Sequence, residues 1–358
     1  MTDPSEAPGR RTADYDYHLP PELIAQTPAA ERGASRLLVV HRDVLPPSRR
    51  PAVPPLEDRV FTDLADLIPP GDLLVLNDTR VRHARLLGTR PSGAPAEVLL
   101  LHPAADDTWV AMGRPGSALR PGKRIRLGEG AELETVELLA EGYRRVRFVG
   151  LSADAAMARY GRLPLPPYIT HAPTALDEER YQTVFAEREG SVAAPTAGLH
   201  FTPALLAALE ARGVRLARLT LEVGPGTFKP VEVEHILEHP MHPERYEIPT
   251  ALVDAVAATR ARGGHVWAVG TTVVRALESA ADARGALRAG PAETRLMISP
   301  GYRFQVVERL VTNFHLPRST LLMLVAAFAG LDTMRAAYAH AVAQRYRFYS
   351  YGDAMVIR

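Results

Sequence analysis

Cysteine is absent from this chain of 358 residues. Without thiols the protein has no disulfide, no thiolate zinc site, no Cys-ligated iron–sulfur cluster and no cysteine nucleophile. Lysine is nearly absent as well, since all but two of the 42 basic residues are arginine. Guanidinium groups suit the recognition of phosphate and carboxylate, although codon bias is the simpler explanation of this ratio.

One-sided charge and long hydrophobic runs are also missing. The 42 basic residues are balanced by 41 acidic ones, so the net charge of +1 requires no polyanionic partner. The longest apolar run, Leu321–Leu331, is far shorter than the ~20 residues that cross a bilayer. Residues 1–17 lack the apolar core of a secretion signal. We therefore expect a soluble, cytoplasmic protein with no membrane association.

Two common nucleotide-binding signatures do not occur. No GxGxxG follows a predicted strand and no GxxxxGK[ST] is present, which disfavours dinucleotide-dependent redox chemistry and P-loop hydrolysis. Segment 234–244 is rich in His and Glu, but its spacing is not HExxH and Pro240 and Pro243 interrupt any helix. We expect no metal site there.

The length of 358 residues predicts about two domains. Residues 1–13 are polar and interrupted by Pro and Gly, which predicts a disordered tail. Residues 41–59 contain five prolines and predict an exposed loop. Between 85 and 150, short runs of alternating apolar residues separated by turn residues predict a small antiparallel, barrel-like β unit.

The rest of the chain alternates strands and helices. The expected strands are residues 73–76, 191–195, 215–223, 265–270, 309–314 and 353–357. Capping signals mark several helices between them, such as Thr202 before Pro203 and Ser319 before the apolar segment that follows it. This alternation predicts a parallel sheet covered on both faces, open or closed as a barrel. We thus expect an α/β fold, with an α/β-barrel-like main domain (1–84 and 151–358) interrupted by a small antiparallel β-barrel (85–150).

Polar and glycine-rich loops follow five of the predicted strands. They are Asn77–Arg80, Thr196–Phe201, Gly224–Phe228, Gly270–Thr272 and Asn313–Pro317. Because ligands of parallel α/β folds bind at the carboxyl ends of the strands, we expect these loops to form one site.

The Gly270–Thr272 turn is the strongest of these signals. A glycine turn that leads into a helix offers free N–H donors and a helix dipole to an anion or a carboxylate. Arg275, one turn further on, either binds the same anion or pairs with Glu278 on the helix surface. The loop that begins at Gly224 is by itself more typical of an ordinary turn.

Two histidines, His200 and His315, each follow a predicted strand end. An imidazole titrates near neutral pH, so both are candidates for general acid–base catalysis, with Glu222 as a possible carboxylate partner. Residues 345–352 interleave cations with aromatic rings, an arrangement that binds nucleic acids and that a packed C-terminal strand would equally explain.

Several of these strings together resemble one family, the S-adenosylmethionine:tRNA ribosyltransferase-isomerases of queuosine biosynthesis. The resemblance extends over nearly the whole chain and includes GDLLVLNDTRV, LPLPPYI, VAAPTAGLHFT, VGPGTFKPV, AVGTTVVRALES, LVTNFHLPRSTLLMLVAAFAG and YRFYSYGDAM. It implies an α/β-barrel with an inserted small β-barrel, and a reaction without metal or separate cofactor. In that reaction the ribosyl part of S-adenosylmethionine is transferred to 7-aminomethyl-7-deazaguanine at the tRNA wobble position and isomerised. The products are epoxyqueuosine in tRNA, adenine and methionine.

The resemblance and the loop positions together give each candidate residue a role. His200 or His315 would transfer a proton, with Glu222 as the third catalytic candidate. The substrate-binding candidates are Asn77, Arg80, Thr196, Gly198, Gly224, Gly226, Thr227, Gly270, Thr271, Thr272, Arg275 and Asn313. The tRNA-binding candidates are Arg345, Arg347, Tyr349 and Tyr351. Within these sets, Asn313 and Thr196 would bind ribose or base, and the Gly270 turn with Arg275 would bind the methionine carboxylate. We expect a monomer.

The chain departs from the family pattern at three places. Glu222 stands where the family usually has histidine, Val273 where serine is commoner, and residues 46–55 replace a shorter loop. A divergent enzyme that transfers a ribosyl group from S-adenosylmethionine to another, possibly small, acceptor is therefore the alternative. A non-catalytic tRNA-binding protein is a third reading.

Overall fold

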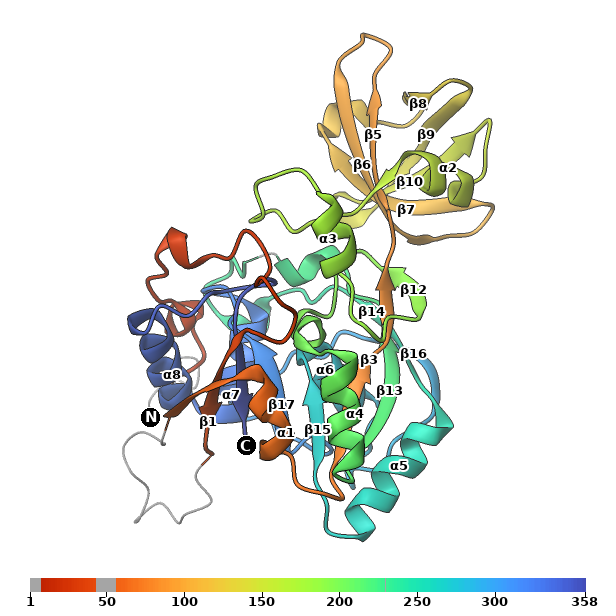
Figure 1. Ribbon diagram of the computed structural model, residues 1–358. Helices are drawn as coiled ribbons and strands as arrows, with labels where there is room; N and C mark the ends of the chain where they lie inside the picture. Colours follow the sequence, from red (N-terminus) through yellow and green to blue (C-terminus); the bar gives the residue numbers. More distant parts are fainter. Residues whose placement is uncertain (1–7, 43–55, 229) are drawn as a thin grey trace, which may run out of the picture.

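The computed structural model describes residues 8–42, 56–228 and 230–358. Figure 1 shows a larger α/β body and a small β-barrel that lies beyond one end of it. The helices are α1 Leu64–Leu67, α2 Ala153–Tyr160, α3 Ala175–Arg180, α4 Pro203–Ala211, α5 Thr250–Ala261, α6 Thr271–Ala280, α7 Thr320–Ala329 and α8 Leu331–Ala343.

The body is built on a nine-stranded sheet in the order β16-β14-β13-β3-β15-β17-β18-β1-β2. These strands are β1 Arg36–Val40, β2 Leu56–Val60, β3 Leu73–Asn77, β13 Arg215–Leu221, β14 Glu244–Ile248, β15 Val266–Val269, β16 Gly290–Thr294, β17 Arg309–Asn313 and β18 Ala354–Ile357. The central strands β13, β3, β15 and β17 are parallel to one another, so their carboxyl ends share one edge.

Alternating side chains of this sheet enter two different cores. Val75 and Ala268 pack with the apolar faces of α5, α6, α7 and α8. Their strand neighbours Leu74 and Trp267 pack on the opposite face with α1 and α4. Successive side chains of a strand point to opposite faces of the sheet. Helices therefore cover both faces of this sheet, as expected.

The sheet is mixed, whereas the sequence predicted a parallel one. β18 pairs antiparallel with β17, and β14 pairs antiparallel with β13, because the chain returns to the sheet from the opposite end at these two places. In the part of the chain that the structure describes, β16 and β2 are edge strands that do not pair with each other. The closed α/β barrel is therefore not confirmed.

The inserted segment forms a separate antiparallel sheet. Its strands are β5 Arg85–Thr89, β6 Pro95–Pro103, β7 Thr108–Arg114, β8 Arg124–Gly128, β9 Ala131–Leu138 and β10 Arg144–Val149. A pairing of β5 with β8 closes the sheet on itself around a small core. β11, Gly161–Arg162, pairs with β5 from beyond the boundary expected at residue 150.

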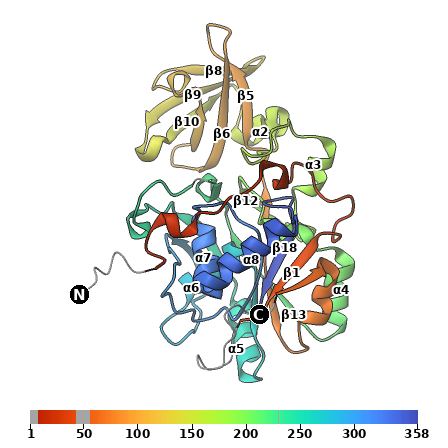
Figure 2. The ribbon, with the colours of Figure 1, turned by 90° about the vertical axis from the view of Figure 1, so that its left-hand side faces the viewer.

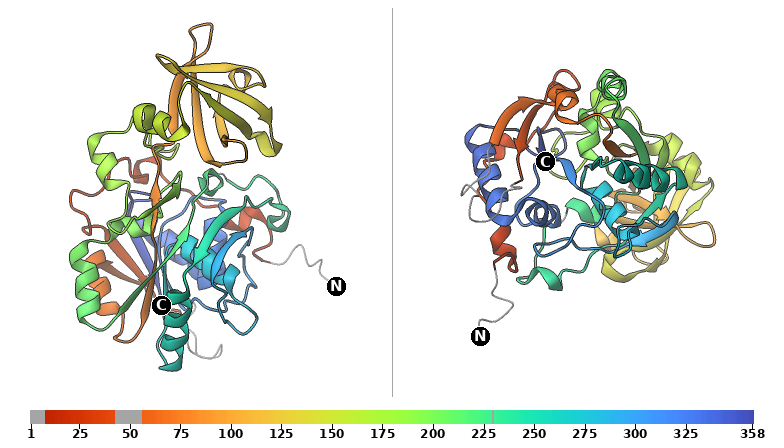
Figure 3. Two further views of the ribbon diagram at one scale, coloured as in Figure 1. Left: turned by 90° about the vertical axis from the view of Figure 1, so that its right-hand side faces the viewer. Right: turned by 90° about the horizontal axis from the view of Figure 1, so that it is seen from below.

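The barrel leaves the body at the carboxyl edge of the parallel strands. β3 is followed directly by β4, Thr79–Val81, which leads into β5. β4 pairs with β12, Arg188–Ser191, in a two-stranded sheet beneath the barrel. The barrel lies on this same side of the body in Figure 2 and in the left view of Figure 3.

Three local predictions were wrong. Residues 191–195 are not a strand, since β12 ends at Ser191 and the prolyl segment that follows turns away. Residues 8–13 are ordered, because Thr12 is buried and its hydroxyl donates to the carbonyl of Val233 (2.6 Å). The end of the expected loop at 41–59 is strand β2, while residues 1–7 and 43–55 lie outside the described residues.

No single helix of the described chain has the length and apolar character needed to cross a membrane. The pair α7 and α8 meets that test only when the two are taken together, and they are bent by 114° with respect to each other.

Candidate functional site

A cavity opens beyond the carboxyl ends of β15 and β17. Loops that follow these strands provide part of its wall, and Tyr168, Val223 and the segments around Thr196 and Tyr349 provide the rest. The predicted residues that line it are Thr196, Gly270, Thr271, Thr272, Asn313, His315 and Tyr349. Three of the five expected loops therefore do meet at one site.

Gly270 makes the turn from β15 into α6. Its φ of 92° and ψ of 155° belong to a region that is essentially open only to glycine. Its own N–H donates to the carbonyl of Val311 (2.7 Å), which ties the turn to β17. The first N–H groups of α6 have no partner within the helix, and the two threonines there line the cavity. An anionic group is the natural ligand of this end.

Asn77 supports this turn from below. Its carboxamide accepts from the N–H of Leu221 (3.0 Å), donates to the same residue's carbonyl (3.0 Å) and approaches the Thr272 hydroxyl at 3.4 Å. The side chain is fully buried and does not line the cavity. Asn77 thus holds strands β3 and β13 in register and fixes Thr272.

Arg275 does not reach the cavity. Its guanidinium forms a buried ion pair with Glu244, and its Nε donates to the carbonyl of Leu296 (3.2 Å). Glu278, the alternative partner, instead accepts the backbone N–H groups of Val306 (3.0 Å) and Val307 (2.9 Å). The structure gives Arg275 a partner in β14 that the sequence pattern did not indicate.

His315 is the one predicted acid–base residue whose ring lines the cavity. Its Nε2 is 2.8 Å from the hydroxyl of Thr312, the last but one residue of β17. Burial lowers the pKa of His315 to about 3, and no carboxylate opposes that shift. At neutral pH the ring is therefore neutral, and the same burial makes it a weaker base than a free imidazole.

His200 lies in a different hollow, beside Ser35 and Leu199. Its Nδ1 is 2.7 Å from the Ser35 hydroxyl, and its ring stacks on Phe61 with the centroids 4.9 Å apart. Burial lowers the pKa of His200 to about 4, and the Asn313 side chain opposes part of this shift. Asn313 lines the cavity, so His200 lies behind it rather than in it.

The C-terminal segment forms a wall that the sequence reasoning assigned to tRNA. Tyr349 has a φ of 72°, and its carbonyl accepts from the Asn313 carboxamide (2.8 Å). Its ring lies 4.7 Å from that of Tyr168, whose hydroxyl is 2.5 Å from that of Ser350. Tyr168 and Ser350 were missed, although Tyr168 belongs to the LPLPPYI string quoted for the resemblance.

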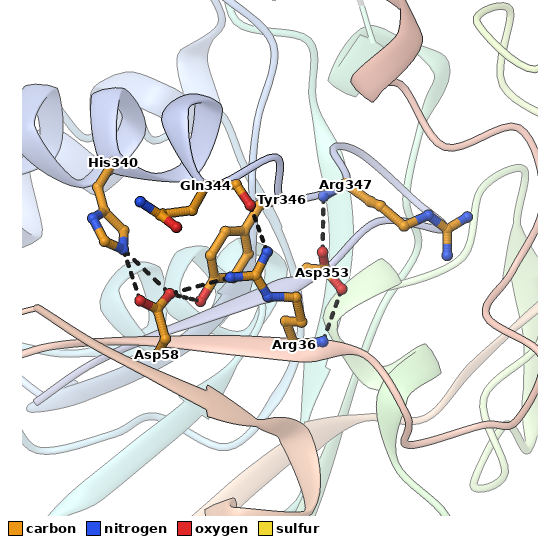
Figure 4. Close-up of polar contacts among 7 residues, drawn as sticks. All are labelled: Arg36, Asp58, His340, Gln344, Tyr346, Arg347 and Asp353. Atoms are coloured by element: carbon orange, nitrogen blue, oxygen red, sulfur yellow. Dashed lines mark hydrogen bonds and ion pairs between the residues drawn. The ribbon is translucent and has the colours of Figure 1, made fainter.

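A polar cluster fixes this segment to the first strands of the sheet (Figure 4). Asp353 accepts the backbone N–H groups of Arg36 and Arg347, each at 2.8 Å. Asp58 accepts from the Tyr346 hydroxyl and is 3.1 Å from the Nε2 of His340. The segment that contains Tyr349 is thus fastened at both ends.

The other predicted residues lie elsewhere. Glu222 pairs with Arg245 (2.7 Å) in an outer groove. Gly198 packs against Phe185, and Gly226 packs against His242. Apart from its chain neighbours, no atom of the described residues lies within 4 Å of where a side chain on Gly224 would begin. The Thr227 side chain lies outside the described part.

The remaining candidates for RNA contacts are divided between surface and core. Arg80 is exposed and donates to the carbonyl of Ala186 (2.8 Å), and Arg345 is exposed. Arg347 donates to the carbonyl of Thr27. Tyr351 is buried, with its hydroxyl donating to Asp177 (2.7 Å). Arg80 and Arg345 are therefore exposed and Arg347 is half-buried, whereas the tyrosines serve the core and the cavity wall.

Among the described residues, no group of three or more His, Cys, Asp or Glu side chains could hold a metal ion. In the His-rich segment, His242 instead contacts Glu141 (2.8 Å) and the hydroxyl of Tyr143 (3.0 Å) of the barrel.

The fold is of the α/β class, and its cavity lies beyond the carboxyl ends of parallel strands, where ligands of such folds usually bind. A model of the family described as "Queuosine biosynthesis protein" matches residues 12–357. The chain belongs to this family.

Curated relatives cover almost the whole chain. A protein of Burkholderia mallei is 56% identical over 350 residues, 96% of this chain and 95% of its own, and one of Thiobacillus denitrificans is 54% identical over 347 residues, 97% of each. Both are named "S-adenosylmethionine:tRNA ribosyltransferase-isomerase". At this identity the chain is an enzyme of queuosine biosynthesis, a transferase and isomerase.

A solved structure resembles the chain as well. It is the crystal structure of an S-adenosylmethionine tRNA ribosyltransferase from Thermotoga maritima, 37% identical, with a TM-score of 0.53. The match covers 96% of this chain and all of that one.

Proposed function

We propose that this enzyme transfers the ribosyl group of S-adenosylmethionine to 7-aminomethyl-7-deazaguanine at the tRNA wobble position and isomerises it. Epoxyqueuosine in tRNA, adenine and methionine leave as products. The family supports the reaction, and the observation that carries it to this chain is the cavity between Gly270 and Tyr349. It combines a free helix N-terminus, a neutral histidine and an aromatic wall.

His315 is the proposed proton acceptor. A sulfonium acidifies the carbons bonded to it, so a nearby base can remove a proton from the ribose 5′ carbon. The ring of His315 is neutral at pH 7 and needs no prior loss of a proton. His200 is a weaker candidate, because it lies behind Asn313 and not in the cavity.

The first turn of α6 is the proposed carboxylate site. The N–H groups around Thr271 and Thr272 bind the methionine carboxylate in place of the guanidinium of Arg275, which is committed to Glu244. Asn313 and Thr196, which also line the cavity, form hydrogen bonds with the ribose or the base.

The tRNA is proposed to approach from the side of the barrel, where β3 leads out of the body at the same edge as the cavity. Arg80 and Arg345 are exposed cations that could contact phosphates. We propose that the protein acts as a cytoplasmic monomer and uses neither a metal nor a separate cofactor.

The alternative acceptor now has less support. It depended on three departures from the family pattern. Glu222 pairs with Arg245 in the outer groove and Val273 is buried in the core, so neither of these two lines the cavity. The third, residues 46–55, lies outside the described residues.

Labelled S-adenosylmethionine, incubated with tRNA that carries the aminomethyl-deazaguanine, tests the proposal. Release of adenine together with labelling of tRNA supports it, release without tRNA labelling supports the alternative acceptor, and binding alone supports a non-catalytic protein. A His315→Ala variant should lose ~100-fold or more in turnover, the lower range for a general acid–base group. His200→Ala should lose less.

A further inference from the structure

Two tyrosines from opposite ends of the chain hold the peptide groups of His315. The Tyr17 hydroxyl donates to the His315 carbonyl (2.6 Å), and the His315 N–H donates to the Tyr338 hydroxyl (3.0 Å). The two rings contact each other edge to face, with centroids 5.2 Å apart. Both hydrogen-bonding groups of one residue's backbone are therefore satisfied by a single pair of aromatic side chains.

Neither tyrosine touches the cavity. Both lie behind it and line a second hollow, between the N-terminal segment and α8. A ligand in the cavity is therefore contacted by His315 and not by these hydroxyls. Any effect of Tyr17 or Tyr338 on the reaction must pass through the His315 backbone.

The ring of His315 has little else to orient it. Among the described residues its one hydrogen-bond partner is Thr312, three residues earlier in β17, and no carboxylate contributes to its pKa. Catalytic imidazoles are usually oriented by a partner on a separate element. Here the separate elements act on the main chain, so the position of the Cα atom is fixed from two sides.

We propose that Tyr17 and Tyr338 are positioning residues that hold the His315 backbone so that the ring faces the reacting carbon. The inference rests on the proposed function, in which His315 accepts the proton. It predicts that the loss of either hydroxyl lowers turnover and leaves substrate binding unchanged.

Tyr17→Phe and Tyr338→Phe test this, with Tyr15→Phe as the matched control. Tyr15 lines the same hollow and donates the same kind of bond, to the carbonyl of Gly9 (2.7 Å), but it does not contact His315. A net hydrogen bond of about 1 kcal/mol corresponds to about fivefold in rate. We expect kcat for adenine release to fall about fivefold or more in the two variants, with KM for S-adenosylmethionine within about twofold, and kcat of the control to stay within about twofold.

A double-variant comparison separates positioning from general loss of stability. In a His315→Ala background, the further change Tyr17→Phe should leave the residual rate unchanged, because the residue it positions is gone. An equal loss in both backgrounds, or an equal loss in the control, would overturn the inference.

The NMR signals of the His315 imidazole, assigned with His315→Ala, provide a readout independent of activity. Tyr17→Phe should shift or broaden them, and Tyr15→Phe should not. If the unaltered protein releases no adenine, the proposed function fails and these signals alone decide the inference. If it is active and the signals and rates of the two variants are unchanged, the inference fails.

Discussion

Replacing Gly270 with alanine separates backbone strain from steric contact at the cavity. A Cβ at this position would lie 3.5 Å from the Thr272 hydroxyl and 3.6 Å from Ala197, which are ordinary contacts. The cost therefore comes from the φ of 92°, a conformation that costs a residue with a side chain about 1–3 kcal/mol. The strain is relieved only if the turn moves, and with it the first N–H groups of α6.

Gly301→Ala is the matched control, since Gly301 has a φ of 99° and an added Cβ would meet nothing within 4 Å. Denaturant unfolding should give a loss of about 1–3 kcal/mol for each variant. Adenine release should fall at least ~10-fold in Gly270→Ala only, because a shift of ~1 Å in a positioning group is enough for ~100-fold. Full activity in a Gly270→Ala variant that has lost the expected stability would refute the assignment of this turn to the ligand.

Three further outcomes follow from buried side chains that titrate or carry a charge. Because burial lowers the pKa of His315 to about 3, titration of this ring should not reduce kcat between pH 8 and pH 5; a loss centred near pH 6.5 that disappears in His315→Gln would contradict this. The pKa of His200 is about 4 in the folded protein and ~6.5 in the unfolded chain. Between these two pH values the unfolded chain binds a proton that the folded protein does not. The free energy of unfolding therefore falls as the pH decreases from about 6.5 to 4, by up to ~3 kcal/mol. Unfolding curves of His200→Asn should depend less steeply on pH in this window. Arg275→Met leaves Glu244 buried without its cation and should cost ~3–5 kcal/mol in unfolding free energy. If Arg275 instead bound the methionine carboxylate, the same substitution would mainly raise KM.

Sequence patterns predicted the parts of the fold that local chemistry determines. Thr202 and Ser319 cap α4 and α7 as expected, because their hydroxyls accept N–H groups of the first helical turn. The four central strands and the edge where the cavity lies followed from the strand–helix alternation. Strand β14 was not predicted at all, and β18 was predicted without its antiparallel direction, because the return path of a chain is set by tertiary packing and leaves no mark on a strand's own pattern.

Position after a central strand predicted the candidate site only in part. The Gly270 turn and the Asn313–His315 loop line the cavity, whereas no described residue of the loops expected after β3 and β13 does. Thr196 lines the cavity although the strand predicted before it does not form. Arg275 and Glu222 were misjudged since ion-pair partners such as Glu244 and Arg245 come from β14, which sequence spacing could not place beside them. Tyr168 was missed because it reaches the cavity from a proline-rich connector.

The central claim is that S-adenosylmethionine reacts in the cavity between Gly270 and Tyr349. A crystal structure of the protein with S-adenosylmethionine, or with an unreactive analogue of it, tests this most directly. The claim predicts the carboxylate at the first turn of α6 and the ribose within reach of His315. A ligand bound in another hollow, with this cavity empty at saturating concentration, would contradict it.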